Sequence, residues 1–108
     1  MKDVITRELA DHYLRDIEPM WRSFWFHMHL YAKNLEEFCD GLCDISDNIY
    51  EYHEKGHKHD MARWVREVIG DGLLADEMEK VKTREEAIRV VCDRVEAVKK
   101  AAGVKKRG

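Results

Sequence analysis

Residues 83–103, TREEAIRVVCDRVEAVKKAAG, decide the fold class of this chain. Thr83 followed by Glu86 is a capping box, in which two side chains satisfy the free N–H groups at the start of a helix. Apolar residues then recur at helical spacing as far as Val98, and Gly103 stands where the helix should end. This stretch predicts the longest helix of an all-α protein.

Similar signals divide the rest of the chain into shorter helices. Residues 3–17 form an amphipathic pattern, and Pro19 marks a corner or opens the next helix. Asn34 with Glu37 starts a helix that runs through Leu42 and Ile45. Other helices should start or end at cap residues, which in chain order are Asp3, Ser46, Gly56, Asp60, Gly70 and Asp71. We therefore expect residues 1–108 to form one compact bundle of about five helices.

Residues 20–32, MWRSFWFHMHLYA, fit two patterns. A helix would place Trp21, Phe24, Trp25, Met28 and Ala32 on one face, whereas a strand would alternate Phe24, Phe26, Met28 and Leu30. We predict a helix, because a lone strand would leave its backbone unpaired unless a second subunit supplied a partner.

Composition restricts the class of protein. The chain has 108 residues, 44% hydrophobic and 38% charged, which suits one folded domain with its own core. The net charge of -3 is spread along the chain, so nucleic acid is an unlikely partner. The stretch with charges of only one sign is the basic tail at 99–108, which we expect to be a frayed, solvated terminus. It contains Lys99, Lys100, Lys105, Lys106 and Arg107.

The cysteines and the apolar segments indicate a cytoplasmic protein. Three cysteines without a signal peptide predict reduced thiols, and Cys39 and Cys43, one helical turn apart, read best as small buried side chains. The longest apolar region, Trp21 to Tyr31, is shorter than the ~20 residues of a membrane-spanning helix. Gln is absent and Asn occurs twice, a composition like that of proteins from hot environments.

An ordered set of short motifs supports a family resemblance. The set is Phe24-Trp-Phe26-His27, Leu35-Glu-Glu-Phe38, Tyr52-His53, Trp64-Val65, Ile69-Gly70-Asp71 and Leu74-Ala75. Over about residues 22–78 the chain resembles a small prokaryotic domain family, met largely in archaea, whose function is uncharacterised. The resemblance implies a helical module and no known reaction.

The histidines are the candidate site. His27 and His29 form one group, and His53, His57 and His59 form another beside Asp60. Imidazole is the commonest metal ligand, and His27, His53, His57 and His59 are therefore candidate ligands for a divalent ion such as Zn, Ni or Fe. The alternative is that His27 and His53 are packed or hydrogen-bonded core residues and that His57 and His59 are polar loop residues.

Catalytic motifs are not readable, and the sequence favours a noncatalytic role. The aromatic residues carry much of the apolar area, and a bundle this small is expected to leave some exposed. We expect Trp21 and Trp25 to lie at an interface, with the chain itself as a homodimer or another protein as the partner. The leading hypothesis is an interaction or self-association module. Metal binding by the histidine cluster is the alternative, and nucleic-acid binding by the tail is a third.

Overall fold

The computed structural model describes residues 4–54 and 59–103 of the chain, and within these ranges the fold is mostly helical. The helices are α1 (Arg7–Leu14), α2 (Leu35–Asp44), α3 (Asp47–Glu54), α4 (Asp60–Trp64), α5 (Gly72–Lys80) and α6 (Arg84–Ala101). A 3-10 helix, η1 (Met20–Arg22), precedes strands β1 (Phe24–His27) and β2 (Leu30–Ala32), and a π-helix, η2 (Val65–Ile69), continues α4. The expected helical fold is confirmed in its main part, with a two-stranded sheet added to it.

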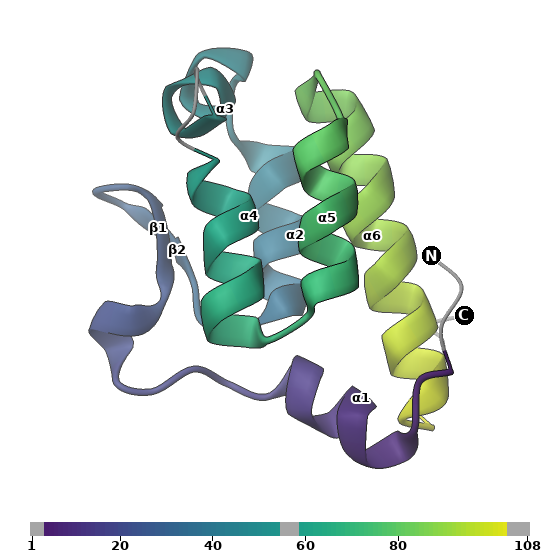
Figure 1. The fold of residues 1–108 in the computed structure, drawn as a ribbon. Coiled ribbons are helices and arrows are strands. Elements are labelled where there is room, and N and C mark those ends of the chain that lie inside the picture. The colour runs from purple at the N-terminus through teal and green to yellow at the C-terminus, as the bar shows by residue number, and fades with distance from the viewer. Residues whose placement is uncertain (1–3, 55–58, 104–108) are drawn as a thin grey trace.

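The helices form one bundle with the hairpin at its side (Figure 1). Helix α2 packs against α6 and against strand β2. The continuous helix α4–η2 packs beside α5 and runs in the opposite direction (Figure 1). Helix α1 contacts α6, α2 and η2 at one end of the bundle. The core is a single cluster that includes fully buried Leu35, Phe38, Leu42, Met61 and Leu74.

Local capping explains where several helices begin. The Asn34 side chain accepts a hydrogen bond from the Glu37 N–H at 2.8 Å, and Thr83 accepts one from the Glu86 N–H at 3.1 Å. Ser46 accepts the Ile49 N–H at 3.2 Å, as its expected role at the start of α3 requires. Asp71 accepts the Leu74 N–H. These four predicted caps are confirmed.

Two predicted helix starts differ from those in the structure. The cap of α1 is Thr6, whose hydroxyl accepts a hydrogen bond from the Leu9 N–H at 3.1 Å. The predicted cap Asp3 lies outside the described residues. Gly56, the predicted end of α3, also lies outside them. Asp60 is the first residue of α4 and not its cap, which is His59 in a left-handed conformation with φ 42°.

The prediction of a helix over residues 20–32 is wrong. Strands β1 and β2 pair antiparallel, with Phe24 opposite Ala32 and Trp25 opposite Tyr31, and the register shifts at Phe26. The next strand follows after a turn of only two residues, so the chain supplies its own backbone partner. A second subunit is therefore not needed to pair β1.

The prediction of reduced, buried cysteines is also wrong. Cys39 of α2 and Cys92 of α6 form a disulfide, and Cys43 is free and exposed. The two bonded residues are 53 positions apart, so only the packing of α2 against α6 brings them together. Sequence spacing holds no sign of this pairing.

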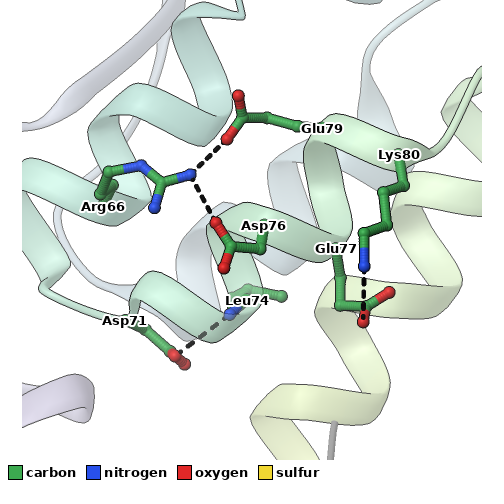
Figure 2. Close-up of polar contacts among 7 residues, drawn as sticks. All are labelled: Arg66, Asp71, Leu74, Asp76, Glu77, Glu79 and Lys80. Atoms are coloured by element: carbon green, nitrogen blue, oxygen red, sulfur yellow. Dashed lines mark hydrogen bonds and ion pairs between the residues drawn. The ribbon is translucent and has the colours of Figure 1, made fainter.

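Ion pairs of two different kinds, exposed and buried, hold α5. In Figure 2, Arg66 of η2 lies between Asp76 and Glu79 of α5, with an Nη2–Oδ1 distance of 2.9 Å to Asp76. These groups are exposed, and such pairs stabilise little. Asp71, in contrast, is fully buried and pairs with Arg94 of α6.

The start of the basic tail is ordered. Lys99 and Lys100 belong to the last turn of α6, and the Lys99 ammonium pairs with Glu36 of α2. This part of the tail is therefore not frayed as expected. Lys105, Lys106 and Arg107 lie outside the described residues. No helix in the described ranges is both long and apolar enough to cross a membrane.

Candidate interaction surface

The two faces of the β1–β2 hairpin have opposite character. Phe24 and Phe26 point inward and are buried, and their rings contact Phe38 of α2 at centroid distances of 5.4 Å. Trp25 points outward and stacks on Tyr31 of the paired strand, with centroids 4.6 Å apart and planes 25° apart. Because strand residues alternate between faces, one buried apolar face and one exposed aromatic face arise from the same short sequence.

Apolar side chains on both sides of the stacked pair are also exposed. We call the set Met20, Trp21, Trp25, Met28 and Tyr31 the hairpin patch; their exposed fractions are 54%, 77%, 39%, 82% and 37%. With accessible areas of about 200–250 Å² for side chains of this size, the patch offers roughly 600 Å² of apolar surface. The largest apolar patch of a monomer is usually about 300–600 Å², so an exposed apolar area of this size along one short stretch of chain indicates an interaction site.

A buried histidine holds the hairpin against the helices. His53 of α3 lies with Nε2 at 2.9 Å from the Phe26 carbonyl oxygen and Nδ1 at 3.2 Å from Oδ2 of Asp60. Both neighbours offer acceptor oxygens, so each contact is a hydrogen bond when the ring nitrogen that faces it donates. The register shift at Phe26 frees its carbonyl group for this contact.

A buried carboxyl group lies next to this contact. Burial, together with the nearby charge of Asp60, raises the pKa of Glu54 to about 7. The Met61 N–H donates to the Glu54 carboxyl group, while its Oε2 is buried without a hydrogen-bond partner. Glu54 and Asp60 thus place two acidic groups close together where α3 ends and α4 begins.

An open groove runs beside the hairpin patch, between β1 and the α4–η2 helix. It has a volume of about 340 Å³. Its lining consists of Phe24, Trp25, His53, Asp60, Arg63, Trp64, Glu67 and Val68. The Trp64 Nε1–H donates to the Arg22 carbonyl oxygen at 2.8 Å, which ties η1 to the edge of the groove. The π-helical geometry of Glu67 and Val68 is rare and often occurs at functional sites.

The structure describes three of the four predicted metal ligands and does not place these three in one group. His27 lies on the exposed face of β1, and its Nδ1 accepts the His29 N–H at 3.2 Å. His53 lies behind the opposite face, with both ring nitrogens engaged. His59 precedes α4, and His57 lies outside the described residues. Within residues 4–54 and 59–103, no group of three or more His, Cys, Asp or Glu residues is placed to hold a metal ion.

Trp21 and Trp25, the predicted interface residues, are both exposed and come from one continuous stretch of chain. Sequence reasoning missed Tyr31, which completes the stack, and Glu54. The alternation of residues 24–30 could have identified Tyr31 as an outward residue, had the strand pattern been preferred. Nothing in the local sequence marks Glu54, since the groups that act on its carboxyl group, Asp60, Met61 and Glu79, belong to the later helices α4 and α5.

Comparisons with known proteins found no match for this chain among protein-family models, curated proteins or solved structures. The surface must therefore be interpreted from its own geometry.

Proposed function

We propose that this chain is a noncatalytic interaction module that self-associates as a homodimer through the hairpin patch. The observation that carries the proposal is the Trp25–Tyr31 stack on the solvent face of a sheet whose other face packs against the core. Aromatic residues and methionine are enriched at protein interfaces, and the hairpin patch contains only these residue types.

The size of the hairpin patch supports a second copy as the partner. A standard interface buries about 800 Å² on each partner. The roughly 600 Å² of apolar side chain in the patch would form the centre of such an interface. In a two-fold dimer, one self-complementary patch serves both subunits, so no second surface is required.

The arrangement of His53 supports a role without catalysis. A general base needs a ring nitrogen within reach of its substrate. Here one nitrogen faces the Phe26 carbonyl oxygen and the other faces Asp60. The two contacts of His53 tie the hairpin to the helices, and we infer that this is the role of His53.

We propose a cytoplasmic location for the module, although one of the observations behind that prediction, reduced thiols, does not hold for Cys39 and Cys92. The Cys39–Cys92 disulfide fits that location if the protein comes from a hot environment, because intracellular proteins of hyperthermophiles are often rich in disulfides. We also propose that the chain belongs to the small prokaryotic, largely archaeal, family of helical domains that its motifs resemble.

Analytical ultracentrifugation over a wide concentration range tests the proposed function. Wild-type protein should change from monomer to dimer as concentration rises, and Trp25→Ala should weaken the dimer about 30-fold or more, as loss of a central aromatic residue does. Leu73→Ala is the matched control, because Leu73 is an exposed apolar residue on α5. A wild-type protein that stays monomeric throughout would refute the proposal.

A further inference from the structure

We propose that the groove between β1 and the α4–η2 helix receives the Trp21 side chain of a second copy. Each Trp21 would then fill the groove of the other subunit about a two-fold axis. This inference rests on the proposed self-association and adds to it the contact that fixes how the two copies fit together.

Trp21 is a preformed projection. Its side chain is 77% exposed, the highest value among the aromatic residues of the described chain. Its backbone is nevertheless held in place: the Arg22 N–H donates to the Pro19 carbonyl oxygen at 2.9 Å and the Ser23 N–H to that of Met20 at 3.0 Å. Because the backbone is already fixed, binding of this indole costs conformational entropy only in the side chain itself.

The groove has the character of an interface pocket. Its walls include the aromatic rings of Phe24, Trp25 and Trp64, and its volume of about 340 Å³ exceeds that of one aromatic side chain. Charged residues, among them Arg63 and Glu67, stand at its rim. An apolar centre with a polar rim is the usual anatomy of a protein–protein contact.

A second copy is the occupant that these features favour. The chain's own Trp21 does not enter the groove, as its exposure shows, although η1 lies directly beside it through the Trp64–Arg22 hydrogen bond. Trp25 belongs to both the hairpin patch and the groove wall, so the two surfaces are continuous. The groove lining contains two acidic residues, Asp60 and Glu67, against one arginine, Arg63, so its acidic excess complements the exposed Arg22 beside each Trp21.

Complementation between two variants tests the inference. Trp21→Ala removes the projection, and Val68→Arg places a charged side chain in the groove. Each variant alone should lose both Trp21 contacts and dimerise about 30-fold more weakly than wild type. Mixed together, they should form a heterodimer more readily than either forms a homodimer, because one intact Trp21 meets one intact groove.

The outcomes separate this inference from the proposed function. If wild type dimerises, Trp25→Ala weakens the dimer and Trp21→Ala does not, the hairpin patch is the interface and the groove contact is refuted. If the mixture gives no heterodimer although both variants are folded by circular dichroism, the groove contact is again refuted. Should Val68→Arg fail to fold, Glu67→Trp takes its place, because this exposed rim residue tolerates a bulky side chain that covers the groove.

Discussion

Asp71 and Arg94 form a buried, two-point ion pair that joins the start of α5 to the middle of α6. The Arg94 Nε lies 2.7 Å from Oδ2 of Asp71, and its Nη2 lies 3.0 Å from Oδ1. Both side chains are almost completely buried, and the Arg94 guanidinium group lies 5.7 Å from the ring centroid of Tyr13. The pair therefore connects three helices through one charged contact.

Asp71→Ala should lower the free energy of unfolding by about 3–5 kcal/mol, because it leaves the Arg94 charge buried without its partner. It also removes the cap of α5. Urea unfolding followed by circular dichroism measures the loss. Asp76→Ala is the control, since it breaks an exposed pair with Arg66 and should cost only about 0–1 kcal/mol. Equal losses in the two variants would contradict this account.

Glu54 should make the protein less stable as pH rises towards neutrality. Its pKa is about 7 in the folded chain against 4.5 for the ordinary group, so the folded state holds a proton that the unfolded state has released. The stability that protonated Glu54 contributes is fully present below about pH 4.5 and is lost as pH rises through about 7. Glu54→Gln, which stays neutral, should be more stable than wild type at pH 8 by about 1–2 kcal/mol.

The measurement is the thermal midpoint of wild type and Glu54→Gln at pH 5 and pH 8. Glu51→Gln provides the control, because Glu51 is exposed on the same helix α3. A difference between wild type and Glu54→Gln that does not grow with pH would show that Glu54 is not buried in this way.

Gly41 should resist replacement although it lies within a helix. A Cβ atom at this position would meet the ring of Phe26 closer than real Cβ atoms approach other atoms. Gly41→Ala should therefore lower the free energy of unfolding by about 1–3 kcal/mol through overpacking, despite the better helix propensity of alanine. Gly72→Ala on α5 is the matched control, with no atom closer than 3.9 Å, and should be neutral or stabilising. Chemical denaturation of both variants measures the change in the free energy of unfolding that each substitution causes.

The arrangement of His53 also predicts the response to metal ions. Because both ring nitrogens already have partners, adding Zn, Ni or Fe to untagged protein should leave its thermal midpoint unchanged. One bound ion per chain, lost in a His53→Ala, His57→Ala double variant, would show instead that the histidines form a metal site. Elemental analysis and calorimetric titration make the distinction.

Sequence patterns predicted the features that depend on neighbouring residues. Asn34 and Thr83 were identifiable as caps because a cap and the N–H groups it satisfies lie within three residues. The single helical domain followed from the same local signals. The exposure of Trp21 and Trp25 was expected, because a small bundle cannot cover so much aromatic surface.

Features that depend on contacts between distant residues could not be predicted in this way. The alternation of Phe24 and Phe26 is visible in the sequence, but the strand that pairs with it, Leu30–Ala32, is too short to be recognised there. His53 meets Phe26 across 27 residues, and the buried carboxyl group of Glu54 depends on helices that follow it. An odd number of cysteines indicated free thiols, and only the packing of α2 on α6 reveals which two are bonded.

The Cys39–Cys92 bond has a consequence for how the chain responds to proteases. It closes a covalent ring that contains α3, α4, η2 and α5, while α1 and the hairpin lie outside it. A single peptide-bond cleavage between these two cysteines would therefore produce a nicked protein whose halves stay on one molecule. The nicked chain would run as one species on a gel without reductant and as two fragments with it, and it would keep the hairpin attached to α6 after the cut.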